Sequence, residues 1–324
     1  MATSPIPGVG ITPAAGGIFN ERMELRFDPS GNVSIVAGTH SHGQGHATVY
    51  AQMVSEWLGV PFESVRVVQG DTDQVPFGRG TYAARSSMIG GCALKAAADQ
   101  VVEQAKPMAA HLMEAAAEDI VQTDGGFAVA GVPDKKASWR QIAAAAYGGK
   151  VPHGMELGLQ ETAFFDPKRE AWGFGAHLAL VRIDRETGIP TLQKLVLVDD
   201  CGVVINPMIL NGQIHGGVVQ GIGQALYEHT VYDDQGQLLT GSFMDYAMPH
   251  SYNTPSIDAV YHPVPATTNP LGVKGCGEAG CAGALTSVMN AVVDALSAYG
   301  IKHIDMPATP HRVWKAIQDA QKKQ

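Results

Sequence analysis

The sequence is poor in charged residues, in cysteine and in long apolar runs. Only 16% of its 324 residues are Asp, Glu, Lys or Arg, and four are cysteine. So few cysteines exclude the disulfide framework of a small secreted protein, so a reducing, cytoplasmic setting is expected. The sequence has no apolar run of about 18 residues, which argues against a membrane span. The first residues, MATSPIPGVG, lack the charged and apolar regions of a secretory signal.

Basic charge is also scarce. The chain has 22 Lys and Arg against 31 Asp and Glu, a formal net charge of −9, and its only basic run is Lys322-Lys323. Nucleic-acid binding needs clustered Lys and Arg, so it is not expected. Apolar residues make up 45% of the chain, a content that excludes intrinsic disorder.

Glycine, in contrast, is abundant, with 38 residues. The length predicts two domain-sized units, which we place at 1–150 and 151–324. Alternating segments at 21–28 and 32–38 predict a β-hairpin, and helical periodicity follows Gly45 and covers 207–226. Further strands are expected at 174–184, 189–199, 229–239 and 257–262. These patterns predict a mixed α/β (α+β) fold of two subdomains, each with helices layered on a sheet.

The segment THSHGQGHAT, residues 39–48, contains three histidines close together. His40, His42 and His46 do not have the spacing of a typical zinc site, so metal binding is the weaker interpretation. The helix entry at 43–45 could instead present backbone N–H groups and the Gln44 amide to a polar ligand. An ordinary glycine-rich turn remains the simplest alternative.

The segment GRGTYAARSS, residues 78–87, places Arg85 and two serines at the start of an Ala-rich helix. Such a helix start can bind an anion through its free N–H groups. An N-terminal cap with no ligand explains the same residues equally well.

The segment NPLGVKGCGEAGCAG, residues 269–283, contains G-x-G-x-x-G. It follows a proline-rich stretch rather than a strand, so a nicotinamide site is not expected. Glu278, near a helix start in apolar surroundings, is a candidate general base, although it could merely complement the helix dipole. Cys276 and Cys281 lack the further cysteines of a plant-type iron–sulfur site, which leaves a disulfide or buried thiols.

Taken in order, these segments and VDDCGVVINPMILNGQIHGGVVQGIGQALYE at 198–228 resemble the molybdenum hydroxylases. This family includes xanthine dehydrogenase, aldehyde oxidase and aerobic carbon monoxide dehydrogenase. The resemblance covers about 20–315 and corresponds to the C-terminal half of the molybdopterin-binding large subunit. It implies that Glu278 is the catalytic base. It also implies cofactor contacts at Gly43, Gln44, Gly45, Thr48, Ala83, Ala84, Arg85, Ser86, Gln220, Lys274 and Gly275.

The resemblance implies a molybdenum–molybdopterin cofactor, in bacteria usually the cytosine dinucleotide form. The pterin dithiolene holds the metal, so no protein side chain is expected to coordinate it. The implied reaction is hydroxylation of an electrophilic carbon in an N-heterocycle, aldehyde or similar small molecule, with water as the oxygen source. Glu278 would deprotonate the metal-bound hydroxyl, and hydride would pass to the sulfido ligand.

The family's large subunit is longer than this chain, and its first half holds other cofactor contacts and most of the substrate pocket. The resemblance therefore implies a separate chain with the first half, an iron–sulfur subunit and an FAD subunit as partners. We favour a natural split subunit over a fragment, and expect the chain to bury a large face against its other half. The alternatives are a non-catalytic cofactor-binding or assembly partner and an unrelated nicotinamide-dependent dehydrogenase.

Overall fold

The computed structural model describes residues 20–322, which divide into two compact units. The first unit comprises 20–171 with 267–273, and the second comprises 172–266 with 274–322. The division falls at 171/172 rather than at 150/151, because strand β7 (Gln160–Phe165) pairs with β1 (Glu21–Phe27) of the first unit. Among the described residues, no helix combines the length and apolar character needed to cross a membrane.

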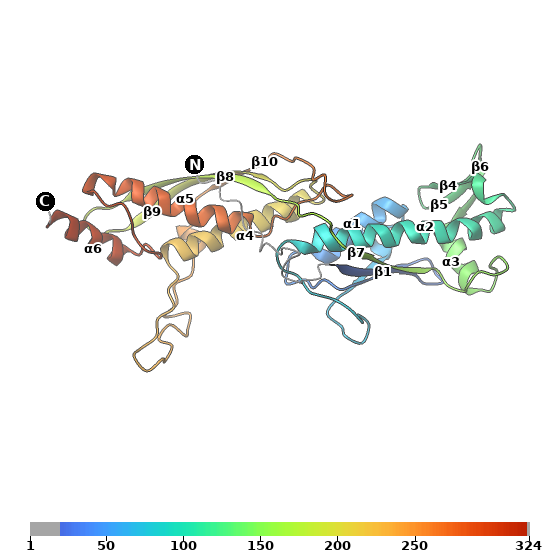
Figure 1. The fold of residues 1–324 in the computed structure, drawn as a ribbon, viewed down its shortest axis with the longest axis horizontal. Helices are drawn as coiled ribbons and strands as arrows, with labels where there is room; N and C mark the ends of the chain where they lie inside the picture. Colours follow the sequence, from blue (N-terminus) through green and yellow to red (C-terminus); the bar gives the residue numbers. More distant parts are fainter. Residues whose placement is uncertain (1–19, 323–324) are drawn as a thin grey trace. The chain divides into compact units, whose positions relative to one another are not determined.

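The first unit combines two sheets with three helices (Figure 1). The larger sheet has the order β3-β2-β1-β7, and the smaller has the order β4-β5-β6. The predicted hairpin is confirmed, since β1 and β2 pair antiparallel from Met23–Ala37 to Phe27–Val33. The remaining elements are β2 (Val33–Ala37), β3 (Val65–Val68), β4 (Ile120–Thr123), β5 (Gly126–Val129), β6 (Val132–Ser138), α1 (His46–Leu58), α2 (Gly91–Met113) and α3 (Trp139–Tyr147).

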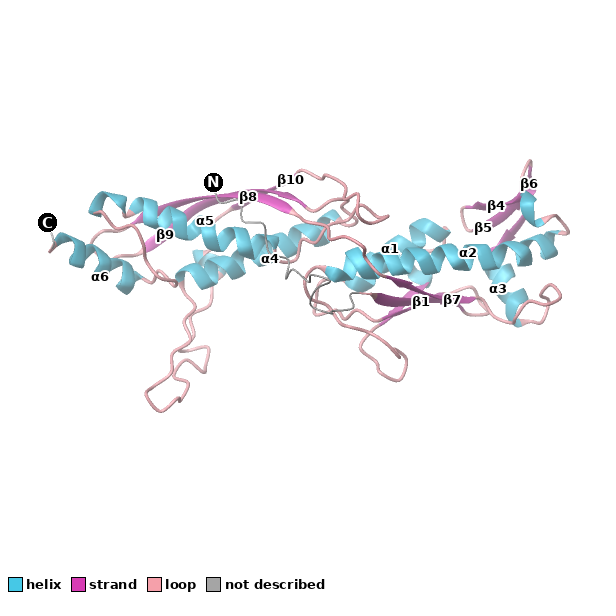
Figure 2. Cartoon of the chain, in the orientation of Figure 1, coloured by secondary structure: helices cyan, strands magenta, loops and turns pink. Residues whose placement is uncertain are grey.

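The second unit has one sheet, of order β10-β9-β8, with helices on one of its faces (Figures 1 and 2). Its strands are β8 (Phe174–Ile183), β9 (Pro190–Asp200) and β10 (Ile257–Tyr261), and its helices are α4 (Pro207–Leu226), α5 (Ala279–Ala295) and α6 (Pro310–Gln321). The two units together confirm the predicted mixed α/β fold.

The strand predicted near 229–239 is wrong. Between α4 and β10 the chain forms a long loop that extends away from the helices (Figure 2), with a single isolated bridge between Tyr232 and Leu238. The Asp233 carboxylate accepts hydrogen bonds from the backbone N–H groups of Gln235 and Gln237, both at 2.9 Å. This side-chain cap favours a turn over a continuous ladder.

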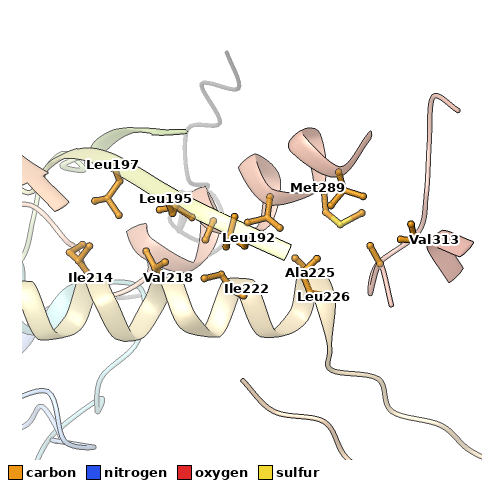
Figure 3. Packing of buried hydrophobic residues seen from close by; sticks show 14 of the residues in the cluster. Leu192, Leu195, Leu197, Ile214, Val218, Ile222, Ala225, Leu226, Met289 and Val313 are labelled. Carbon is orange, nitrogen blue, oxygen red and sulfur yellow. The ribbon is translucent and has the colours of Figure 1, made fainter. Parts of the chain in front are cut away.

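The core of the second unit lies between β9 and the helices (Figure 3). Leu195 and Leu197 on β9 meet Ile214, Val218 and Ile222 on α4, and all five are fully buried. The i, i+4, i+8 spacing of the α4 residues places them on one face of the helix. Burial of this apolar face is what stabilises α4 despite its many glycines.

Two glycines of α4 and one of α5 let these helices approach closely. A Cβ on Gly221 would lie 2.7 Å from the Cys281 carbonyl oxygen, and one on Gly217 would lie 3.1 Å from the Cys281 nitrogen. From the other side, a Cβ on Gly280 would lie 2.8 Å from the Val218 nitrogen. Any larger residue here would force the two backbones apart.

Candidate functional site

The Gly43-Gln44-Gly45 loop leads into α1. Gly43 and Gly45 have φ of 110° and 79°, a region that favours glycine. Gly45 is the N-cap of α1, and no side chain caps the helix. The N–H groups of the first turn, which includes Thr48, therefore have no side-chain acceptor, and such a helix start can bind an anion or the polar edge of a ligand.

Gln44 is folded back onto its own loop. Its Oε1 accepts a hydrogen bond from the His42 backbone N–H, and its Nε2 lies 3.3 Å from His42 Nδ1. The side chain is half-buried. A Cβ on the neighbouring Gly43 would meet nothing within 4 Å, so the loop is open beside Gln44.

The second predicted loop lies beside the first. The Gly80 N–H donates to the Gly38 carbonyl at 3.1 Å, and the His40 N–H donates to Thr81 Oγ1 at 3.2 Å. Tyr50 on α1 donates its hydroxyl to the Ser86 carbonyl at 3.0 Å. Two segments far apart in the sequence thus form one loop cluster within the first unit.

Strained backbone marks the same cluster. Ala83 and Ala84 have φ of 47° and 60°. Left-handed conformations in residues with a Cβ are uncommon, and they concentrate at ligand sites. The next residues form a π-helical turn, Ser86–Gly90, that runs into α2.

Arg85 points into the protein rather than outward. Its guanidinium pairs with the Glu21 carboxylate and donates to the carbonyls of Gly80, at 2.8 Å, and Asn20, at 3.1 Å. Ser86 Oγ lies 2.6 Å from Thr81 Oγ1. These contacts of the Arg85 side chain stabilise the loop. The groups of the loop that can donate hydrogen bonds to a ligand are therefore its backbone N–H groups.

The histidines of the first segment do not converge on one point. His40 Nδ1 lies 3.3 Å from His42 Nε2, while His46 is buried in α1. Burial, together with the neighbouring His42 and His40, lowers the pKa of His46 to about 4. Within residues 20–322, no three His, Cys, Asp or Glu side chains are grouped to hold a metal ion.

On the second unit, α4 presents a face of small residues. A Cβ on Gly212 or Gly216 would meet nothing within 4 Å, and both glycines are exposed. Gln220 is also exposed and follows at the same four-residue spacing. The three residues thus form one open strip along the helix.

Glu278 is exposed and stands at the N-cap of α5. Its carboxylate makes no hydrogen bond or ion pair with the described residues. Burial, followed by the charges of Glu278 and Glu228, raises the pKa of the nearby Cys281 thiol. Glu278 is therefore a carboxylate near the helix start that is available to a ligand.

A salt bridge anchors the loop that carries Glu278, and sequence reasoning missed its acidic partner. Lys274 Nζ binds Asp200 Oδ2 at 2.5 Å, and the two side chains are 8% and 10% exposed. Burial alone would raise the pKa of Asp200, but Lys274 and the N–H groups of Val264 and Gly202 lower it overall. In the sequence, the adjacent acidic residues Asp199 and Asp200 at the end of a predicted strand could have indicated this partner.

The loop is held at two further points beside this salt bridge. The Lys274 N–H donates to the Cys201 carbonyl at 3.0 Å, and Gly173 lies close to the Gly275 carbonyl. All four cysteines are free thiols. A thiol–thiol hydrogen bond raises the pKa of Cys201 and lowers that of Cys276, so Cys276 pairs with Cys201 rather than with Cys281.

The predicted cofactor contacts therefore form two groups, one on each unit. The first unit offers uncapped N–H groups, open glycines and strained backbone, and the second offers the open strip of α4 and the exposed Glu278 carboxylate. Phosphates and heterocycle edges require N–H donors and little steric obstruction. On each unit, taken by itself, the residues present thus fit part of a phosphate-bearing heterocyclic cofactor.

Comparison with known proteins gives a consistent picture. The chain matches the family described as molybdopterin cofactor-binding domain over residues 4–255. It is 38% identical to the carbon monoxide dehydrogenase large chain of Hydrogenophaga pseudoflava, covering 94% of this chain and 38% of that protein. It is 39% identical to the nicotine 6-hydroxylase large subunit of Paenarthrobacter nicotinovorans, with the same coverage.

Solved structures agree with these sequence matches. The carbon monoxide dehydrogenase of Oligotropha carboxidovorans superposes with a TM-score of 0.87 at 36% identity, covering 95% of this chain and 38% of that one. Quinoline 2-oxidoreductase from Pseudomonas putida 86 gives a TM-score of 0.83 at 40% identity, covering 93% and 38%. The chain thus spans 38% of the length of each of these relatives.

Proposed function

The chain belongs to the molybdopterin cofactor-binding domain family of the molybdenum hydroxylases, and we propose that it forms part of an active enzyme. In this proposal the assembly hydroxylates an electrophilic carbon of a small N-heterocycle or aldehyde, with water as the oxygen source. The names of two relatives, a nicotine hydroxylase and a quinoline oxidoreductase, support the N-heterocycle class.

The proposed cofactor is molybdenum–molybdopterin in the cytosine dinucleotide form. When bound, it supplies the oxidation–reduction step. On the first unit, the start of α1 and the Ala83–Ser86 turn would donate backbone N–H groups to its polar edges. On the second unit, Gln220 and the open strip of α4 would admit it without steric obstruction. Lys274 and Gly275 would act by shaping the Glu278 loop.

The single observation that carries the catalytic part of the proposal is the Glu278 carboxylate. It is exposed at the start of α5, while the buried Lys274–Asp200 pair holds the loop before it. A general base must be both accessible and held within hydrogen-bond reach of the proton it removes. We assign Glu278 the role of accepting a proton from the attacking oxygen.

The proposed partners follow from the share of the relatives' length that this chain matches. Since the chain spans 38% of its relatives, the rest of the large subunit must come from elsewhere, in the same or a separate polypeptide. Iron–sulfur and FAD subunits would carry the electrons onward.

Replacing Glu278 with Gln tests the role of this residue. General-base catalysis contributes about 10²- to 10⁴-fold, so turnover by the native assembly should fall by that factor. Molybdenum content should stay unchanged, because the substitution removes only the charge. Turnover is followed with N-heterocycles and aldehydes, and metal by elemental analysis.

The matched control is Glu186→Gln, which changes an exposed carboxylate in the turn between β8 and β9 and should leave turnover intact. If Glu278→Gln assembles normally and retains full turnover, the chain is a non-catalytic cofactor-binding or assembly partner instead.

A further inference from the structure

Strand β8 forms one edge of the sheet in the second unit. The order β10-β9-β8 leaves β8 paired only with β9 over its ten residues. Among the described residues, its other edge has no hydrogen-bonded neighbour. A long edge strand of this kind presents a row of N–H and C=O groups that can pair with another strand.

The sheet face beside this edge is unusually apolar for an exposed surface. Ala179, Val181 and Ile183 of β8 pack on the core, whereas the alternate residues Leu178 and Leu180 are 71% and 57% exposed. The outward residues of a solvated sheet are normally polar. Strands that are apolar on both faces are typical of a sheet covered on both sides.

The register extends this apolar surface across the sheet. Ala176 of β8 lies beside Val198 of β9, which lies beside Val260 of β10. The exposed charges on this face are few: Lys194 pairs with Asp258 at 2.7 Å, and Arg182 lies near the end of β8. A surface on which apolar side chains predominate fits the core of a protein–protein interface better than it fits a charged ligand.

A groove of about 340 Å³ runs along β8 and α5. Its α5 side is lined mostly by small or uncharged residues that include Ala282, Thr286 and Asn290, and also by Asp294. Two polar atoms of lining residues, His177 Nδ1 and Asp199 Oδ2, are buried and have no hydrogen-bond partner within residues 20–322. Buried polar atoms are nearly always satisfied in a complete assembly.

We propose that an extended segment of the large subunit, from outside this chain, pairs with the open edge of β8 and adds a strand to the sheet. The inference rests on the proposed function, because that function identifies the occupant. The relatives are more than twice as long as the segment they share with this chain, so they carry enough additional sequence. Alternate side chains of the added strand would enter the groove, and the others would pack beside Leu178 and Leu180 on the outward face.

A photo-reactive amino acid at position 178 tests the proposal in the native assembly. The tagged chain is purified from its own cells and irradiated, and the crosslinked peptides are identified by mass spectrometry. We expect crosslinks to a peptide similar to the part of the relatives' large chains that this chain does not cover. Position 157, a leucine 66% exposed in the first unit, is the matched control and should not crosslink to that peptide.

Hydrogen exchange and a charge substitution provide independent measurements. Amides of 174–183 should be protected in the assembly, and Leu178→Lys should reduce the recovery of the partner segment at least tenfold, unlike Leu157→Lys. Crosslinks confined to a second copy of this chain, or rapid exchange throughout 174–183, would overturn the proposal. Molybdenum is measured in the same preparation, because its absence alongside a confirmed crosslink would reject the proposed function and leave the interface standing.

Discussion

At the scale of single residues, Arg85 shows that tertiary contacts, and not the local sequence, determine what a side chain binds. It is 1% exposed and pairs with Glu21, which is 0% exposed. The local sequence around Arg85 resembles an anion-binding loop, but the partner lies 64 positions earlier. Burial of both charges means that each depends on the other to avoid the desolvation penalty.

Replacing Arg85 with Met should therefore lower the free energy of unfolding by about 3–5 kcal/mol, because the Glu21 carboxylate is left buried and unpaired. The double variant Glu21→Gln/Arg85→Met removes both charges and should recover much of the loss. Urea unfolding monitored by circular dichroism measures both effects. A single variant as stable as the wild type would show that the pair is not buried in solution.

His46 gives a second prediction at this scale. Its pKa is lowered from 6.5 to about 4 in the folded protein, so the unfolded state binds the proton more readily. The stabilising contribution of neutral His46 is complete above pH 6.5. It is lost as the pH falls from that value towards the folded pKa. His46→Gln should flatten the fall of unfolding free energy across this window, and an unchanged slope would contradict the assignment.

At the scale of elements, the sequence predicted α4 at 207–226 and the structure confirms those bounds. Glycine is unfavourable inside a helix unless another group approaches closely, but the sequence does not show which group approaches the glycines of α4. The structure divides these residues, because Gly217 and Gly221 face α5 whereas Gly212 and Gly216 face open space. Helical periodicity assigns residues to a common face, but only tertiary packing determines what covers it.

The dependence on tertiary packing also explains why sequence analysis missed strand β7 and the Lys274–Asp200 salt bridge. Strand β7 is short and pairs with β1, some 140 residues earlier, at Glu24–Thr162. The Lys274–Asp200 salt bridge spans 74 positions. The hairpin and the helices follow from local patterns, whereas these contacts depend on non-local pairing that one sequence does not reveal.

Paired alanine substitutions in α4 distinguish the two kinds of glycine. Gly221→Ala should lower the free energy of unfolding by about 1–3 kcal/mol, since its Cβ would meet α5. Gly216→Ala should raise it by up to about 1 kcal/mol, because alanine favours the helix and no atom obstructs it. If the open strip also faces the cofactor, Gly216→Ala will reduce molybdenum content despite its greater stability. Equal destabilisation by both substitutions would contradict the assigned packing.

At the scale of the whole molecule, the low charge and the apolar face of the second unit have a common explanation. Only 16% of residues are charged, and β8 exposes Phe174, Leu178 and Leu180 by more than half. A surface of this kind is typical of a chain that functions within a larger assembly. The resemblance to the molybdenum hydroxylases likewise implies further cofactor contacts outside this chain.

The chain produced alone should therefore associate or precipitate and contain no molybdenum, because the apolar face is uncovered and the cofactor contacts are incomplete. Size-exclusion chromatography with light scattering measures the first effect, and elemental analysis measures the second. Leu178→Lys combined with Leu180→Lys should shift the isolated chain towards the monomer by adding charge to that face. A stable monomer already loaded with cofactor would show that residues 1–324 form a complete site, and the interpretation of β8 as an interface would then fail with it.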